Sequence, residues 1–221
     1  MPIDPQLWLL QANDTAYPSG SYAHSFGLEE LVEAGVVGNA TDLENFIERQ
    51  ILPALLTFEI PLFARAHAAA LAEDADTMLA IDRELDAWRI PAELRDASRR
   101  IGSQRLDLLA RLDPSEWVLR YRALAPRSHH LLVTALELSG VPVAQAARAF
   151  AFQSIAGLTA ASMKLMRIGQ TACQLIARRS LAKLGEKIDG ALSQEPDGWF
   201  NPLLEIASFR HARAHARLFI S

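Results

Sequence analysis

The sequence predicts an all-α protein, a single-domain bundle of roughly eight to ten helices that covers residues 1–221. Alanine and leucine recur at helical spacing along the chain, and alternating β-branched runs are few. Half of the 221 residues are hydrophobic, which is enough to fill one core without disulfides or metal. Helices of average length, about 11 residues each with their loops, give the expected number.

The first elements are predicted from turn and capping residues. Residues 18–27 form a Gly- and Ser-rich turn in which Gly20 takes a special backbone angle, and His24 or Ser25 caps a helix over 26–34. A capping box at Thr41-Asp42-Leu43-Glu44 starts the next helix. We expect Pro53 to kink that helix and Pro61 to start another.

The remaining boundaries follow from proline, glycine and a second capping pattern. Pro91 and Pro114 suit a first helical turn, and the pattern Asp113-Pro114-Ser115-Glu116 caps the helix that follows. Gly140 suits a left-handed end to the helix over 131–138. A turn at 195–198 separates the last residues, so we expect 202–221 to be a C-terminal tail that docks on a partner.

Composition restricts the compartment and the class of protein. The net charge is −4, the single Cys173 cannot form an internal disulfide, and residues 1–4 lack the layout of a signal peptide. No uninterrupted apolar run reaches the ~18 residues of a membrane span. We therefore expect a cytoplasmic protein that does not cross a membrane.

The turn at 18–27 resembles a catalytic or phosphate-binding loop only superficially. A P-loop ends in Gly-Lys-Ser/Thr, and this segment contains no lysine. A serine-hydrolase elbow has glycine two residues on each side of the serine, whereas Ser25 has Gly27 after it but Ala23 before it, with no preceding strand. The spacing favours an ordinary turn that caps a helix.

Metal and nucleic-acid binding are both disfavoured by charge. His211 and His215 are four residues apart and would share a helix face, with His129-His130 as a further source of ligands. The neighbouring Arg210, Arg213 and Arg217 would repel a dication, so we expect neither a permanent metal site nor a cofactor. Arginines at 99, 100 and 105 alternate with acids at 96 and 107, which is typical of a solvated helix face.

Three motifs in the expected order resemble the urease accessory protein UreF family. The first is residues 17–29, YPSGSYAHSFGLE; the second is residues 164–171, KLMRIGQT; the third is residues 206–211, IASFRH, followed by RLF at 217–219. The region 74–95 is also similar to the family. Ala212 departs from the family's glutamate, and the His129-His130 region matches only loosely.

The resemblance implies an all-α homodimer that acts with UreD (also called UreH) and the GTPase UreG to deliver nickel to apo-urease. In that family the protein is neither an enzyme nor a GTPase, and it modulates GTP hydrolysis by its partner. Two alternatives remain open: a helical enzyme that uses Lys164, His24 or Ser25, and a helical DNA-binding regulator.

The candidate partner-binding residues come from all three motifs. We expect the first motif and the tail to contact UreD, and Lys164 with Gln170 to affect UreG from a polar surface of the dimer. We expect no contact with nucleic acid or membrane. The candidates are Tyr22, His24, Ser25, Glu29, Lys164, Gly169, Gln170, Arg210, His211, Arg217 and Phe219.

Overall fold

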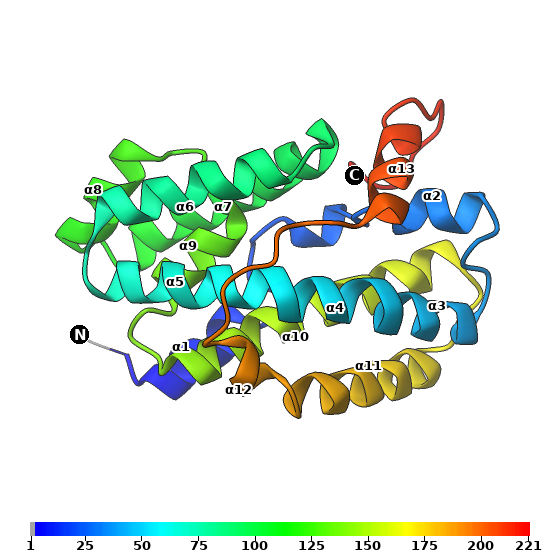
Figure 1. The fold of residues 1–221 in the computed structure, drawn as a ribbon, viewed down its shortest axis with the longest axis horizontal. Coiled ribbons are helices and arrows are strands. Elements are labelled where there is room, and N and C mark those ends of the chain that lie inside the picture. The colour runs from blue at the N-terminus through cyan, green and yellow to red at the C-terminus, as the bar shows by residue number, and fades with distance from the viewer. Residues whose placement is uncertain (1–2) are drawn as a thin grey trace.

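A computed structural model describes residues 3–221 and confirms the all-α prediction (Figure 1). Met1 and Pro2 lie outside the described residues. The α-helices are α1 (Pro5–Ala12), α2 (Leu28–Glu33), α3 (Ala40–Phe46), α4 (Leu52–Ala54), α5 (Ile60–Leu71), α6 (Ala75–Trp88), α7 (Ala92–Leu112), α8 (Glu116–Leu124), α9 (His130–Glu137), α10 (Val143–Leu165), α11 (Gln170–Gly185), α12 (Ile188–Ala191) and α13 (Pro202–His211). A 3₁₀ turn, η1 (Ser21–Ala23), precedes α2, and two π-helical turns, η2 (Ile47–Ile51) and η3 (Leu55–Glu59), connect α3, α4 and α5.

Elements α3 to α5 form one continuous helix, Ala40–Leu71, which runs along the molecule (Figure 1). It begins one residue before the predicted start. Asn39, in extended backbone, caps it by accepting hydrogen bonds from the amides of Thr41 at 2.9 Å and Asp42 at 3.1 Å. By length and composition this helix is apolar enough to cross a membrane, but 56% of that window is buried inside the protein. It packs here as a core helix.

The two prolines of this helix do not interrupt it, which corrects the prediction that Pro53 kinks it and Pro61 starts a new one. A proline lacks the amide hydrogen and crowds the carbonyl four residues earlier. The helix widens into a π turn in front of each proline, at η2 and at η3, and so absorbs that crowding. Pro61 also leaves the carbonyl of Thr57 without its usual helical partner.

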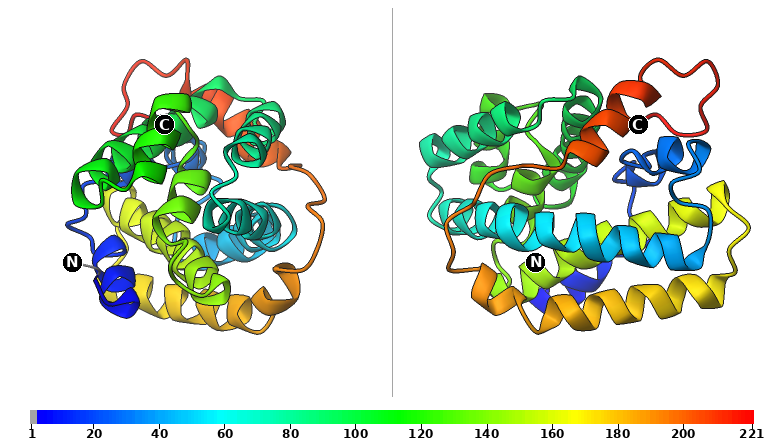
Figure 2. Two further views of the ribbon diagram at one scale, coloured as in Figure 1. Left: turned by 90° about the vertical axis from the view of Figure 1, so that its left-hand side faces the viewer. Right: turned by 45° about the vertical axis from the view of Figure 1, so that its right-hand side comes forward.

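The residues between α12 and α13, 192–201, form a strap that uses this free carbonyl. The amide of Asp197 donates to the Thr57 oxygen at 2.9 Å, and Asn201 Nδ2 donates to the Gln50 oxygen in η2 at 3.3 Å. Trp199 packs edge-on against Phe58. Figures 1 and 2 show the strap crossing the outside of the long helix on its way to α13. The strap therefore binds to the long helix at backbone oxygens that lie next to its two prolines.

Helix α9 is the centre of the core, and every residue from Leu131 to Glu137 is buried. It packs against α5, α6, α7 and α10. Gly102 of α7 permits the close approach, because a Cβ there would lie 2.0 Å from the Ser128 carbonyl oxygen and 2.8 Å from the His129 carbonyl carbon. The buried α9 and the long helix thus define one core.

The other helix boundaries show which local sequence signals correctly predict where a helix begins or ends. Ser115 caps α8 as predicted, with its hydroxyl accepting from the Val118 amide at 3.3 Å. Pro91 is the N-cap of α7 and Pro114 precedes the N-cap of α8, so both stand just outside the first helical turn. Gly140 is not left-handed, because α9 ends at Glu137 with Leu138 as its cap. Counting residues 40–71 as one, the described chain has eleven helices, of which α2 and α12 are only six and four residues long.

Candidate functional site

The N-terminal motif, residues 17–29, folds as a sequence of tight turns. Gly20 has the left-handed φ of +76° that its position predicted, and Phe26 and Gly27 follow with φ of +51° and +87°. The helix predicted over 26–34 begins at Leu28, with Gly27 rather than Ser25 or His24 as its N-cap, although the Ser25 hydroxyl does accept the Glu29 amide at 3.3 Å. These turns leave Tyr22 78% exposed and bury His24, Ser25 and Glu29.

The C-terminal segment, residues 202–221, lies against this motif and is not a free tail. The Ile220 amide donates to the Ala23 oxygen at 2.9 Å, and the Ser221 carbonyl accepts from the amides of Ser25 and Phe26. The Ser25 hydroxyl donates to the same carbonyl at 2.9 Å. Backbone pairing of this kind joins two segments that are almost 200 residues apart in sequence. Residues 202–221 thus pack on the body of this chain, and their docking on a partner stays a prediction.

His211 holds the C-terminal segment to two helices. Its Nε2 lies 2.9 Å from Glu29 of α2 and its Nδ1 lies 2.8 Å from Glu93 of α7. Glu29 also accepts the amides of Leu218 at 2.6 Å and Phe219 at 2.9 Å, and Arg217 lies 3.3 Å from Glu93. Glu93 is a partner that sequence reasoning missed, because nothing near it in the sequence indicates the pairing.

The electrostatics of this cluster favour charged side chains. Burial alone would lower the pKa of His211, but hydrogen bonds and charges from Glu93 and Glu29 raise that pKa above its usual 6.5. Burial would raise the pKa of Glu29, but the amides of Leu218 and Phe219 and the His211 ring hold it below 4.5. The cluster is most stable as an imidazolium between two carboxylates.

Residues from all three motifs meet at Lys164, at the end of α10. The Lys164 Nζ lies 3.5 Å from the Tyr22 carbonyl oxygen, 5.3 Å from the centre of the Tyr22 ring and 5.2 Å from the centre of the Phe219 ring. Both ring distances fall within cation–π range. We call Tyr22, Lys164 and Phe219 the motif junction. Sequence analysis identified its members but did not predict that they touch.

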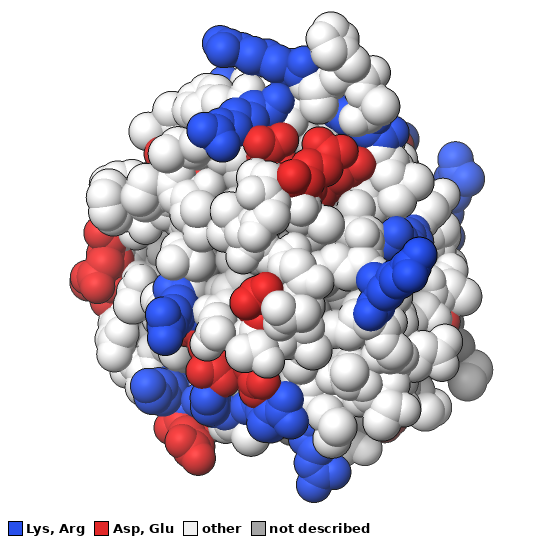
Figure 3. All heavy atoms as spheres, turned by 90° about the vertical axis from the view of Figure 1, so that its right-hand side faces the viewer, with Lys and Arg blue, Asp and Glu red and all other residues white. Residues whose placement is uncertain are grey.

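The surroundings of the motif junction are partly apolar and exposed. Met163, Leu218 and Ile220, the sequence neighbours of Lys164 and Phe219, are each more than one third exposed. Figure 3 shows this end of the molecule, where patches of Lys and Arg and of Asp and Glu are separated by wide areas of uncharged atoms. An exposed aromatic ring with apolar and basic neighbours suits a protein interface.

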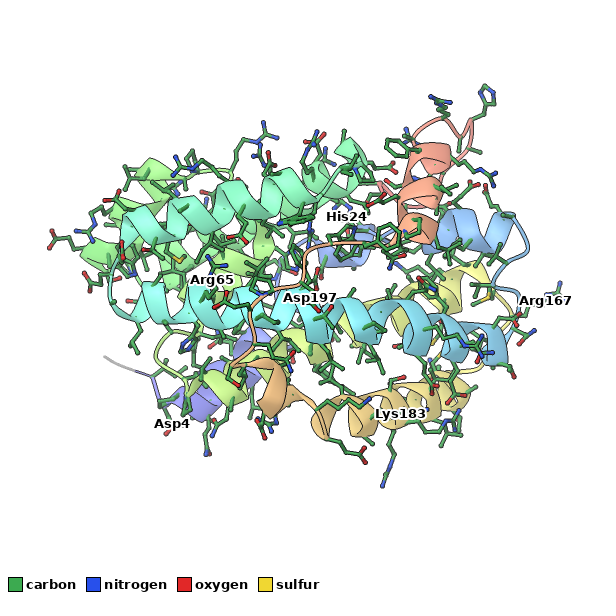
Figure 4. All side chains as sticks on the ribbon, in the orientation of Figure 1. Asp4, His24, Arg65, Arg167, Lys183 and Asp197 are labelled. Atoms are coloured by element: carbon green, nitrogen blue, oxygen red, sulfur yellow. The ribbon has the colours of Figure 1, made fainter. Side chains whose placement is uncertain are left out.

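The other predicted residues lie near this end. Gly169 and Gln170 are exposed at the start of α11, after the short connection from α10, and are not part of the motif junction. Arg210 is exposed, whereas Arg217 pairs with Glu93. In Figure 4, Arg167 points outward at the end of the molecule and His24 lies inside it.

The candidate catalytic groups are not arranged as an active site. The Ser25 hydroxyl donates to a backbone carbonyl, and His24 Nδ1 lies 2.8 Å from the Ser221 hydroxyl, so the two are not paired as nucleophile and base. Burial and the nearby Arg100 lower the pKa of His24 to about 4, which keeps it neutral. Lys164 is exposed beside the two rings.

A second polar cluster superficially matches a Ser-His-Asp arrangement. His129 Nδ1 lies 3.0 Å from the Ser98 hydroxyl and its Nε2 lies 3.2 Å from Asp86. Both Ser98 and His129 are fully buried, so no substrate reaches the hydroxyl. Burial, with Arg89 and two other arginines, lowers the pKa of His129 to about 2. The cluster therefore joins α6, α7 and the start of α9 as a structural element.

Most of the arginines and histidines weighed for nucleic acid and metal have other partners. Arg99 pairs with Asp86 at 2.8 Å, and Arg105 pairs with the buried Glu137. Both ring nitrogens of His211 are occupied by carboxylates, and His215 is exposed. Within residues 3–221, no group of three His, Cys, Asp or Glu side chains is placed to hold a metal ion.

A partly open pocket of about 130 Å³ is lined by residues of the N-terminal motif and by Trp199 of the strap. It is lined mainly by apolar side chains, and its polar groups include His24, His130, and the ion pair of Arg89 with Glu59 at 2.7 Å. Burial lowers the pKa of Arg89 and raises that of Glu59, against their mutual attraction. Burial also lowers the pKa of His130 well below 6.5.

Fold and site together define an all-α protein in which three separated sequence motifs converge at one exposed end. The UreF family model matches residues 37–181. The chain belongs to the UreF family of urease accessory proteins. Curated relatives named urease accessory protein UreF include one from Alkalilimnicola ehrlichii, 33% identical with 98% of this chain and 95% of the relative covered, and one from Escherichia coli O157:H7, 32% identical with 99% and 98% covered. A third, from an Arthrobacter species, is 28% identical with 98% and 97% covered.

Proposed function

We propose that this chain is a non-catalytic adaptor of urease maturation in the cytoplasm, which bridges UreD (UreH) and the GTPase UreG during nickel insertion into apo-urease. In this role nickel is the cargo and GTP hydrolysis is carried out, and modulated, at the partner. Membership of the accessory family supports the proposal. The single observation that carries it is the motif junction, where three motifs of the chain meet and the exposed Tyr22 and Lys164 lie beside the buried Phe219 ring.

The geometry changes how the surface is divided between partners. Sequence analysis assigned Tyr22 to UreD and Lys164 to UreG, but the two side chains are in contact. A partner that covers the exposed Tyr22 ring also covers the Lys164 ammonium. We propose that one partner occupies the whole motif junction and that Gln170, Gly169 and Arg210 extend its edge.

The adaptor role also includes a homodimer, as the family resemblance implies. A stable symmetric dimer buries at least ~1,000 Å² in total. Light scattering at micromolar concentration is expected to give twice the mass of the chain, and a particle of single-chain mass would contradict the dimer.

Removal of the Tyr22 ring tests the function. We expect Tyr22→Ala to weaken binding by about 2 kcal/mol, or about 30-fold, because an exposed aromatic anchor is desolvated in the complex. The thermal stability should stay within about 0.5 kcal/mol of wild type, since the ring is 78% exposed. Affinities for purified UreD and for UreG are measured separately, which identifies the partner at the motif junction.

Leu124→Ala is the matched control, because Leu124 is 53% exposed on α8 at the other end of the molecule. It should bind both partners like wild type. Lys164→Ala should weaken the same partner as Tyr22→Ala and lower urease activation in cells. If Tyr22→Ala binds UreD and UreG with wild-type affinity, the motif junction is not the adaptor surface. Binding of duplex DNA or turnover of a substrate by the isolated chain would favour the alternatives.

A further inference from the structure

The stretch from His211 to Ser221 is anchored at both ends and mostly exposed between them. His211, Phe219 and Ser221 are buried, whereas Ala212, Arg213, and 215–218 are exposed. Figure 1 shows residues 212–217 as a loop that stands away from α13 before the chain returns to the N-terminal motif. A loop with few contacts of its own depends on its anchors to stay closed.

The anchors rest on three side chains that we call the lock: Glu29, His211 and Glu93. The His211 ring lies within 2.9 Å of a carboxylate at each nitrogen. An imidazole donates hydrogen bonds from both nitrogens only when it is protonated. A neutral ring would therefore turn one lone pair toward a carboxylate, and this would weaken one side of the lock.

Each element packed around His211 contributes a charged or polar group to the lock. Helix α2 supplies Glu29, α7 supplies Glu93, α13 adds the Ser208 hydroxyl at 3.4 Å from Glu93, and the loop adds Arg217. Helix α10 supplies Lys164, whose ammonium faces the Phe219 ring. Histidine is the residue type here whose ordinary pKa lies near neutral pH.

Residues 218–221 bind to residues 23–29 in the way that an extended peptide binds to its receptor. We call residues 23–29 the cradle. The Ala23 oxygen, the Ser25 and Phe26 amides and the Glu29 carboxylate bind four successive residues of the C-terminal segment. Release of that segment would expose these groups together. They would then be free to bind another extended strand by the same main-chain pattern.

We propose that residues 212–221 form a releasable latch over the N-terminal motif, which the Glu29–His211–Glu93 lock holds shut and which opens when His211 loses its proton. The open form presents the cradle of residues 23–29. This inference concerns the chain alone and does not depend on the proposed function.

The direction of the pH effect follows from the two shifted groups. The pKa of His211 is raised by closure, so its contribution is complete below 6.5 and is lost as pH rises through the raised value. The pKa of Glu29 is lowered, so its contribution is complete above 4.5 and is lost as pH falls through the lowered value. The latch is tightest between these limits and loosens through neutral and alkaline pH.

Hydrogen–deuterium exchange of the full-length chain tests the latch. We measure the amides of Leu218, Phe219 and Ile220 from about pH 6 to 9, corrected for intrinsic exchange. In wild type their protection should fall with rising pH. His211→Gln should exchange about tenfold faster at pH 6 and lose the pH dependence, because a neutral amide cannot make both charged hydrogen bonds. His215→Gln is the control and should match wild type, since His215 is exposed.

A second variant covers the case in which His211→Gln unfolds the protein. Arg217→Gln removes a partly exposed partner of Glu93, so the core is preserved. It should speed exchange of the same amides by a smaller factor and keep the pH dependence. Unchanged protection in both variants would overturn the proposal. Exchange of residues 218–220 only at the rate of the α9 amides would also overturn it, because the segment would then open only with the whole protein.

Discussion

Each end of this chain is held by a cluster in which a positively charged side chain pairs with carboxylates. The two clusters differ in whether the positively charged side chain can lose its proton. In the core, Arg105 pairs with Glu137, and Tyr17 and the Ala12 carbonyl join the same cluster. At the exposed end, His211 lies between Glu29 and Glu93. A guanidinium keeps its charge at every physiological pH, whereas an imidazolium does not. The same kind of pairing thus gives a permanent anchor in one place and a reversible one in the other.

The core cluster is therefore expected to be the more costly to break. Glu137→Ala should lower the free energy of unfolding by about 3–5 kcal/mol, because it leaves the Arg105 charge buried without a partner. Urea denaturation near neutral pH measures the loss. The double variant Arg105→Met with Glu137→Leu should recover most of it. A loss below about 1 kcal/mol for Glu137→Ala would mean that water reaches Arg105.

The next test concerns the close approach of α7 to the start of α9 at Gly102. This contact positions Arg105, which lies one turn further along α7. Gly102→Ala should cost about 2–3 kcal/mol, since its Cβ would meet the fixed Ser128 carbonyl at 2.0 Å. Gly157→Ala in α10 is the control. It has no atom within 4 Å of the new Cβ and should stabilise the helix by about 0.5–1 kcal/mol. Equal melting temperatures for the two variants would contradict this account.

The smallest expected effect on global stability belongs to the lock. His211→Gln should lower the free energy of unfolding by about 1 kcal/mol at pH 6, since one neutral hydrogen bond can remain. The difference from wild type should shrink as pH rises, because the ring of wild-type His211 then loses its proton, whereas the cation of the core cluster is a guanidinium. Parallel urea titrations at two pH values compare the clusters directly. A pH-dependent loss in both variants would remove the distinction.

Local signals in the sequence were enough for the fold class, the Ser115 cap and the left-handed Gly20. They failed where a distant segment supplied the partner. Pro61 breaks an isolated helix, but here the strap takes up the Thr57 carbonyl that the proline leaves free. The packing of residues 202–221 on the body was not predicted, because the partners of His211, Glu29 and Glu93, lie more than 100 residues away in sequence.

The candidate residues were found by motif, but their arrangement was not. Tyr22, Lys164 and Phe219 belong to three motifs, and no periodicity within one motif indicates contact with another. The burial of His24 and Glu29 was likewise hidden, since both lie in a polar turn where exposure is the ordinary expectation. The pattern of residues within one motif does not predict contacts with residues far away in the sequence.

The backbone pairing between residues 23–26 and 220–221 has a consequence for biosynthesis. A ribosome makes the N-terminal motif first and its partner strand almost 200 residues later. Contacts with so large a sequence separation form late in folding. A nascent chain therefore carries the motif in an incomplete form until residues 211–221 have emerged.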